Sequence, residues 1–249
     1  MTLTTRTEQA IVAQIVAKAF PRSRQETGRS LVALADVRHF AADETVVAQG
    51  EERRTVLVLD GHIGFRRTTP DGREVIPRIV SIGGLASLMP IARRPSVVEI
   101  VALSPSWVAL WPSRGLQALA AGDAGLALDL IEHVVLSLEV IAQRLDGLVH
   151  QNASRRVARV LERHADMFFG EEAVLTRAHL PALVGTSREM TGRVLRSLES
   201  DGVVERVGRD RLGLLNAARL ARTAAQRPAA REKKRRNMFL AKPRRAVPQ

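Results

Sequence analysis

The chain has 249 residues, contains no cysteine and carries a formal net charge of +12. Its length suits two domains, and the missing cysteines exclude disulfides, cysteine-ligated zinc, iron–sulfur clusters and thiol catalysis. The positive charge favours a polyanionic partner such as nucleic acid. However, residues 227–249 hold nine Lys or Arg and one Glu, so residues 1–226 carry only +4.

Residues 1–35 predict an N-terminal helical segment. This segment lacks the uninterrupted apolar core of a secretory signal peptide. The most apolar run of the chain, residues 126–142, is interrupted by charged residues that include Asp129, Glu132 and Glu139, so it does not predict a transmembrane helix. The sequence therefore predicts a soluble, cytoplasmic protein without a membrane partner.

Residues 36–121 predict a β-rich domain. Short runs of valine, isoleucine and leucine alternate there with turn-forming glycine, proline and aspartate, at a spacing of roughly ten residues. The clearest of these runs cover residues 55–60, 63–69, 74–80, 96–103 and 106–111. Such a series of short strands is typical of a small sandwich or barrel.

Residues 122–151 predict one long helix, because apolar residues recur at alternating spacings of three and four. The seam begins with Ala124 and Ala127 and continues through Ile131, Val134, Leu138, Ile141, Leu145 and Leu148. This heptad seam favours a coiled coil that joins two copies into a homodimer. An amphipathic helix packed on its own domain is the alternative. A further helix is expected over 153–169, with Asn152 as its N-cap.

Residues 152–226 predict a winged helix-turn-helix domain. A first helix over 177–184 is followed by a turn at Gly185 and by a second helix that starts near Ser187. Pro181 lies inside the first helix and leaves its exact start open, because proline removes a backbone donor.

The second helix of this domain combines an apolar face with a charged one. Arg188, Glu189 and Arg193 fall on the side opposite to the apolar residues, within the first two turns. A recognition helix needs this arrangement, because its N-terminal residues contact base edges while its other face is buried. Residues 203–207 and 211–215, joined by a Gly-Arg-Asp turn, then predict the hairpin that forms the wing.

This part of the chain resembles the bacterial cyclic AMP receptor/fumarate-nitrate regulator (Crp/Fnr) family of transcription regulators. The matching motif is LTRAHLPALVGTSREMTGRVLRSLESDG, residues 175–202, and the order of elements agrees over nearly the whole chain. The resemblance implies an α+β fold. An N-terminal cyclic-nucleotide-binding-like β-roll serves as the sensor, a long dimerisation helix follows, and a winged helix-turn-helix ends the fold.

The resemblance also implies which residues bind double-stranded DNA. In the cyclic AMP receptor subgroup, an Arg-Glu-x-x-x-Arg set reads a TGTGA-like half-site of a palindrome. This chemistry is sound, because arginine forks onto guanine and glutamate accepts from cytosine. The implied DNA-binding set is Thr176, Arg177, Ser187, Arg188, Glu189, Thr191 and Arg193, in which the first two match phosphate-contacting positions. Relatives contact RNA polymerase at the loop that corresponds to residues 169–173.

The sensor half departs from the family pattern. Cyclic-nucleotide-binding members hold the ribose with a glutamate and the cyclic phosphate with an arginine. Here the corresponding positions carry Leu88 and Pro95, or Arg94 after a slip of one residue. The residues that would meet the adenine ring, Ile141 and Ala142, are apolar. We therefore expect neither cyclic AMP nor cyclic GMP to bind, predict no cofactor, and leave the effector open.

The remaining sequence features point to no enzyme. No catalytic arrangement of Ser, His, Asp or paired carboxylates stands out, and the six histidines show no metal-ligand spacing. Haem binding through His62 is a remote alternative. The basic segment 227–249 is either a solvated, disordered tail or an additional set of phosphate contacts. Two rival functions stay open: a nucleoid-type DNA-coating protein that acts through this tail, and a small-molecule sensor module that no longer binds DNA.

Overall fold

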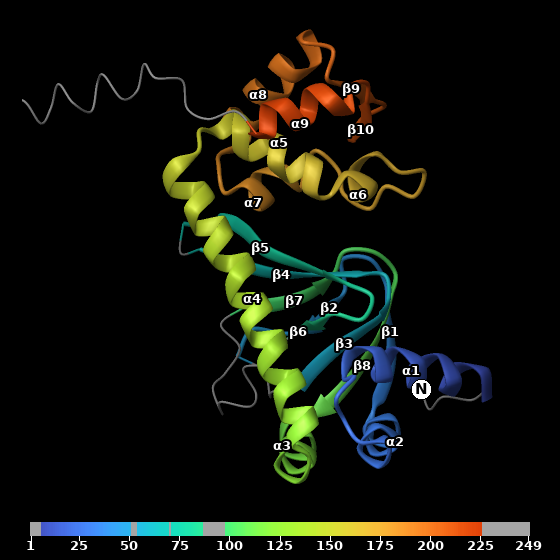
Figure 1. Cartoon of the computed structure of the whole chain (residues 1–249). Coiled ribbons are helices and arrows are strands. Elements are labelled where there is room, and N and C mark those ends of the chain that lie inside the picture. The colour runs from blue at the N-terminus through green and yellow to red at the C-terminus, as the bar shows by residue number, and fades with distance from the viewer. Residues whose placement is uncertain (1–5, 51–53, 70, 87–97, 226–249) are drawn as a thin grey trace, which may run out of the picture.

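The computed structural model describes residues 6–50, 54–69, 71–86 and 98–225. The fold is α+β, as predicted: a β-roll, a long helix along one side of it, and a winged helix-turn-helix at the C-terminal end of that helix (Figure 1). None of the described helices combines the length and apolarity needed to cross a membrane.

The β-roll consists of two antiparallel sheets of four strands each. One sheet has the order β1-β8-β3-β6 and the other the order β2-β7-β4-β5. The first is built from β1 (Asp36–Phe40), β8 (Ser106–Pro112), β3 (Arg54–Asp60) and β6 (Leu85–Ala86). The second is built from β2 (Thr45–Val47), β7 (Glu99–Ala102), β4 (His62–Thr68) and β5 (Glu74–Ser81). The strands predicted from hydrophobic runs are therefore present, and β1, β2 and β6 join them.

Alternation along β3 and β8 divides the apolar residues between two cores. Successive side chains of a strand point to opposite faces. Val56 and Val58 pack inside the roll between the two sheets, whereas Leu57 and Leu59 pack outward against helices. The sheet that contains β3 is thus buried on both faces, which explains why the residues of its central strand are almost all apolar.

Three helices cover the outer face of this sheet. They are α1 (Arg6–Ala19), α2 (Gln25–Leu34) and α3 (Ser113–Gly122), and the first two confirm the helical N-terminal segment. Trp111 is fully buried beneath them, and its indole Nε1 donates a hydrogen bond of 2.8 Å to the Leu31 carbonyl. The helix α3 was not among the predicted elements; it follows β8 directly, and its buried Leu116 packs in the core beneath the three helices.

The long helix is α4 (Ala124–His150), whose 27 residues span about 40 Å. Asp123 caps its N-terminus by accepting hydrogen bonds from the amides of Gly125 and Leu126. One side of α4 lies along the roll, where Leu126 and Leu130 are buried. The helix therefore links the sensor to the winged helix-turn-helix as one continuous element (Figure 1).

The C-terminal domain contains the expected helix-turn-helix and wing. Its elements are α5 (Ala153–Arg163), α6 (Ala165–Phe169), α7 (Leu180–Val184), α8 (Arg188–Ser200), β9 (Val204–Val207), β10 (Arg211–Leu214) and α9 (Ala217–Ala225). Asn152 caps α5 as predicted, since its side chain accepts a hydrogen bond of 2.9 Å from the amide of Arg155. The closing helix α9, which packs on α5, was not anticipated.

Two predicted helix boundaries in this domain were wrong. The helix expected over 153–169 is broken at His164, which leaves the helical conformation, and the break lets the adjacent Met167 and Phe168 both be buried. The first helix of the helix-turn-helix begins at Leu180 instead of residue 177, so Pro181 lies in its first turn. A proline is tolerated there because the first turn leaves its N–H groups without helical partners.

Candidate nucleic-acid interface

The two helices of the helix-turn-helix pack across a shared apolar core. Leu180, Leu183 and Val184 of α7 are buried together with Val194, Leu195 and Leu198 of α8. Gly185 makes the turn between the helices in the left-handed conformation, at φ 70°. A side chain at this position would also approach Leu148 of α4, at 3.2 Å. The turn therefore needs glycine for its backbone conformation, and its close fit to α4 adds a second reason.

Ser187 sets the start of the recognition helix α8. Its hydroxyl accepts a hydrogen bond of 3.1 Å from the amide of Met190 and so caps the helix. This cap fixes the register of the first turn, which projects Arg188 and Glu189 into solvent.

Three charged side chains of α8 form an exposed surface in the first two turns. Arg188, Glu189 and Arg193 are all exposed, and Arg193 Nη2 lies 2.7 Å from Glu189 Oε1. An exposed pair at this spacing contributes little to stability. It does hold the arginine and the carboxylate side by side, and these are the types of donor and acceptor that match base edges.

Thr191 occupies the opposite side of α8. It is 2 % exposed, and its hydroxyl donates a hydrogen bond of 3.0 Å to the Ser187 carbonyl. The side chain therefore packs toward the core of the domain and supports the first turn of the helix. Of the seven predicted DNA-binding residues, this is the one that the structure buries.

Thr176 and Arg177 precede α7 instead of opening it. The amide of Thr176 donates to Nδ1 of His179 at 3.0 Å, and the amide of Arg177 donates to the Asp210 carbonyl in the wing turn at 2.9 Å. Burial lowers the pKa of His179, which keeps the imidazole neutral and its Nδ1 able to accept. These two residues are half-buried and connect the helix-turn-helix to the wing.

The wing adds basic residues that were not singled out from the sequence. Its strands pair antiparallel around the turn at Gly208. Arg209 at the tip has a side chain that is 94 % exposed, and Arg206 donates to the carbonyls of Gly208 and Arg209. The signal available in the sequence was the concentration of arginines at the turn of a hairpin that follows a recognition helix.

The predicted seam forms an uncovered apolar face on α4. Its six members are exposed by 40 to 61 %, although all are large hydrophobic residues: Ile131, Val134, Leu138, Ile141, Leu145 and Leu148. A different side of the helix is covered by the rest of the chain: Asp129 is buried and accepts hydrogen bonds from Arg22 in the turn between α1 and α2. A contiguous apolar surface of this kind marks an interaction site in a water-soluble protein.

The interior of the roll is apolar where the structure describes it. Phe40, Ile63, Ile100 and Leu110 are among the side chains that pack between the two sheets. Leu88, Arg94 and Pro95 lie outside the described residues, so the predicted departure from the cyclic-nucleotide pattern stays a prediction. Ile141 and Ala142, the positions compared with the adenine contacts, are exposed on α4.

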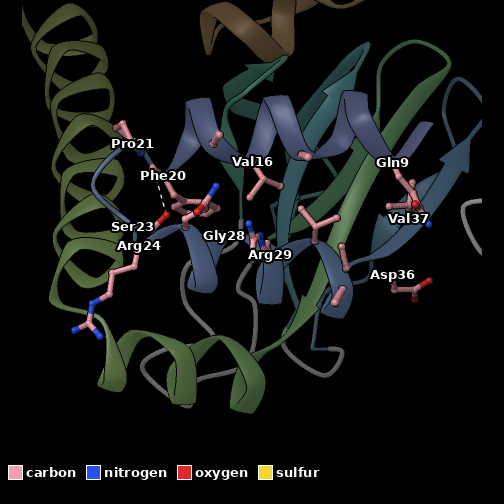
Figure 2. Close-up of a pocket in the computed structure, with 16 residues that line it drawn as sticks. Gln9, Val16, Phe20, Pro21, Ser23, Arg24, Gly28, Arg29, Asp36 and Val37 are labelled. Carbon is pink, nitrogen blue, oxygen red and sulfur yellow. Dashed lines mark hydrogen bonds between the residues drawn. The ribbon is translucent and has the colours of Figure 1, made fainter. Parts of the chain in front are cut away.

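The cavity shown in Figure 2 lies between α1 and α2 and has a volume of about 740 Å³. Val16 and Phe20 line it from the first helix and the turn after it, and Gly28 and Arg29 from the second. Ser23 closes the connecting turn by donating a hydrogen bond of 2.8 Å to the Phe20 carbonyl. Because α1 and α2 lie at the end of the roll away from α8 (Figure 1), this cavity is not part of the nucleic-acid interface.

Metal ligands do not gather anywhere in the described ranges: no three His, Asp or Glu side chains there could hold an ion together. His62, considered as a haem ligand, is the first residue of β4 and is partly buried. Its amide donates to the hydroxyls of Ser104 and Ser106, and burial lowers the pKa of its ring.

Two family models match separate parts of the chain. Residues 37–123 match the cyclic nucleotide-binding domain, and residues 155–223 match the Crp-like helix-turn-helix domain. The first match covers the β-roll together with α3, and the second begins in α5 and ends in α9.

Curated relatives and a solved structure match this chain along most of their own length. The cAMP-activated global transcriptional regulator Vfr of Pseudomonas aeruginosa is 25% identical over 194 residues, which cover 72% of this chain and 89% of the relative. The cAMP-activated global transcriptional regulator CRP of Pasteurella multocida is 24% identical over 183 residues, 70% of this chain and 87% of the relative. The solved structure of a CRP/FNR-family transcriptional regulator from Thermus thermophilus superposes with a TM-score of 0.68 at 22% identity, covering 77% of this chain and 100% of that one.

Proposed function

Because the chain belongs to the Crp/Fnr family of transcription regulators, we propose that it acts as a homodimer that reads a palindromic DNA site. Each α8 enters the major groove at one half-site, and Arg188, Glu189 and Arg193 contact base edges of a TGTGA-like sequence. Ser187 positions this helix by its cap, and Thr176 and Arg177 contact phosphates from the segment before α7.

The observation that carries this proposal is the division of α8 into two faces. Val194, Leu195 and Leu198 anchor the helix in the core, while the arginine and glutamate side chains of its first two turns project into solvent. Any surface helix carries polar groups on its outer face, but here they are two arginines and a glutamate in the first two turns, the side chains that match guanine and cytosine edges. The exposed wing arginines add phosphate contacts beside it.

The apolar face of α4 supports the homodimer. Two copies that bury their seams against each other would remove six large apolar side chains per chain from water. A two-fold axis along this seam places the two recognition helices in successive major grooves, roughly 34 Å apart. The same symmetry accounts for a palindromic site.

Contact with RNA polymerase is proposed for the loop at residues 169–173. Glu171 and Glu172 are exposed there, and the carbonyls of Gly170 and Glu171 accept hydrogen bonds from Arg211 of the wing. The loop is thereby held against the domain that binds DNA, which would position it beside a polymerase at the promoter.

A rival function is a DNA-coating protein that works through its basic tail and has no sequence preference. Selection of bound duplexes from a pool with a randomised centre separates the two functions. We expect an enriched consensus with two-fold symmetry and TGTGA-like half-sites about 10 base pairs apart, centre to centre. Recovery of duplexes without a symmetric consensus would exclude the sequence-specific regulator.

A further inference from the structure

A second cavity lies where the sensor, the long helix and the DNA-binding domain meet. It has a volume of about 370 Å³ and is lined from β5, from the C-terminal half of α4, and from α5 and α7. Figure 1 shows these four elements converging at the junction between the roll and the helix-turn-helix. The recognition helix α8 does not contribute to its lining.

The lining of this cavity is strongly basic. Five arginines and one histidine contribute to it, and no aspartate or glutamate does: Arg78, Arg144, Arg156, Arg159, Arg163 and His164. Elsewhere in the described chain, arginines such as Arg22, Arg66 and Arg219 lie in ion pairs with carboxylates. None of the five cavity arginines lies in an ion pair with a described carboxylate, although Cζ of Arg78 lies 5.6 Å from the centre of the Phe65 ring.

Several of these guanidinium groups keep donors available. Nε of Arg156 is buried and has no hydrogen-bond partner in the described structure. Arg159 makes no recorded hydrogen bond or ion pair there. Arg163 and Arg78 each bond one neutral oxygen, that of the Gln143 amide at 3.2 Å and that of the Ser137 hydroxyl at 2.6 Å. A buried donor without a partner is costly, and an anion that enters the cavity would satisfy it.

Arg144 has a different role, because its donors are already used. Nη1 donates to the Ile76 carbonyl of β5 at 2.8 Å and Nη2 to the Ala182 carbonyl of α7 at 3.2 Å. The side chain therefore ties the sensor and the helix-turn-helix together through α4. It forms a charged wall of the cavity.

Burial is the main cause of the lowered pKa values in this cavity, and neighbouring positive charge adds to it. Burial and then the charge of Arg163 lower the pKa of Arg144. The same two causes, followed by the charge of His62, lower the pKa of His164 to about 4. His164 is therefore neutral at physiological pH, and the arginines supply the positive charge of the site.

We propose that this junction cavity is a binding site for a small molecule that carries two or more phosphoryl groups. A guanidinium group binds two phosphate oxygens at once in bidentate geometry. Five arginines are more than one phosphoryl group can engage, so a ligand with several phosphoryl groups fits better. The cavity volume lies in the lower part of the range of small-molecule sites, about 300–1,000 Å³. A compact ligand therefore fits better than a polymer, and DNA phosphates meet the opposite side of the domain through α8.

Binding at this site would link the sensor to DNA recognition. The arginines come from β5 on one side and from α5 on the other, so a bound polyanion holds the two bodies in one relative orientation. A ligand that prefers this orientation shifts the population of dimers with correctly spaced recognition helices. This consequence rests on the proposed function, whereas binding itself can be measured without DNA.

The test is isothermal titration calorimetry of the full-length protein with inorganic diphosphate, at fixed ionic strength. The test variant is the double substitution Arg159→Gln and Arg163→Gln, which removes two charges from partly or fully exposed side chains. The matched control is Arg29→Gln with Arg114→Gln, which removes two exposed charges from α2 and α3 at the other end of the roll. Succinate serves as the comparison ligand, because it carries two carboxylates and no phosphoryl group.

We expect one diphosphate per chain, bound at least about tenfold more tightly than succinate. The test variant should bind diphosphate about tenfold or more weakly than the wild type, a loss of about 1.4 kcal/mol. The control variant should bind diphosphate within about twofold of the wild type. The affinity of the test variant for random DNA should also stay within about twofold of the wild-type value. Equal weakening in both double variants would show diffuse charge attraction and overturn the proposal. So would the absence of saturable binding, or succinate that binds as tightly as diphosphate. A test variant that loses DNA affinity but keeps diphosphate binding would identify these arginines as DNA contacts and also overturn it.

Discussion

At the residue scale, the recognition helix depends on a few side chains with separate tasks. The Ser187 cap and the buried Thr191 hold the first turn of α8, and Arg188 and Arg193 are left free of packing constraints. The sequence was sufficient to predict the exposed set, because helical periodicity separates it from the apolar face. The same periodicity places Thr191 with Val194, Leu195 and Leu198 on the buried face. Its inward position was therefore readable from the sequence, and only the match to the family motif put it among the DNA contacts.

Substituting Arg188 by alanine separates base reading from general attraction to DNA. A bidentate contact to guanine contributes about 1–3 kcal/mol of discrimination. Arg188→Ala should therefore lower affinity for the selected site by about tenfold or more, and change affinity for random DNA little. Arg209→Ala, at the exposed wing tip, is the matched control and should weaken both DNAs alike. Equal losses on both DNAs for Arg188→Ala, measured by fluorescence anisotropy, would mean that α8 does not read bases.

Asp123 gives a prediction for the dependence of stability on pH. Hydrogen bonds from the side chain of Thr27 and from the amide of Arg24, with those from Leu126 and Gly125 in α4, lower its pKa to about 2. The ordinary value in an unfolded chain is about 3.9. Because the folded pKa is the lower one, the carboxylate stabilises the fold above about pH 4, and this contribution is lost as the pH falls toward 2.

The variant Asp123→Asn removes that charge at every pH. We expect its thermal midpoint to lie below that of the wild type at pH 7, and the gap to narrow between about pH 4 and pH 3. Calorimetric unfolding over a pH series measures both midpoints. Asp146→Asn is a suitable control, because Asp146 is an exposed aspartate of α4, the helix that Asp123 caps. A gap for Asp123→Asn that stays constant down to pH 3 would contradict the assigned hydrogen bonds.

At the scale of the elements, α4 meets two demands with one sequence. Its roll-facing side supplies Leu126 and Leu130 to the core, and its seam supplies the exposed heptad positions. The heptad spacing was readable from the sequence because it repeats over several turns. By contrast, α3 and α9 are short helices of 10 and 9 residues. Their apolar residues do fall on one side, as Leu220 and Ala224 do in α9, but the pattern covers too few turns to identify a helix from spacing alone.

The seam predicts the oligomeric state of the protein. Leu138→Asp with Leu145→Asp places two charges in the proposed dimer interface, and burial of each leucine contributes about 1.5–3 kcal/mol. We expect the double variant to sediment as a monomer at micromolar concentration, where the wild type is a dimer. The matched control is Leu128→Asp with Leu136→Asp, which changes two exposed leucines of α4 outside the seam and should remain dimeric. A dimeric Leu138→Asp/Leu145→Asp variant would contradict the seam.

At the scale of the whole molecule, the sensor and the DNA-binding domain share packed residues. Ile76, Val101 and Leu103 of the roll belong to the same apolar core as α5, α7 and α8, and Arg144 connects both bodies by hydrogen bonds. The sequence predicted two regions with different periodicity but not this junction. Its arginines are spread from residue 78 to residue 163, so only the folded chain brings them together.

A further prediction concerns cyclic AMP and cyclic GMP, because the names of the two curated relatives describe them as cAMP-activated. Leu88 offers no acceptor for a ribose hydroxyl, and a buried phosphate without an arginine partner is costly. We expect calorimetry with cyclic AMP and cyclic GMP to show no binding in the low-micromolar range. Low-micromolar affinity for either nucleotide would show that residues other than the compared positions hold the ligand.

The central claim, sequence-specific DNA binding by the whole dimer, is tested most directly by fluorescence anisotropy at several salt concentrations. The two probes are the selected palindromic duplex and a scrambled duplex of the same length and composition. We predict that the palindrome binds at least about a thousandfold more tightly, and that a large ratio persists while both affinities fall with rising salt. Affinities for the two duplexes that stay within severalfold of each other at every salt concentration would contradict the account.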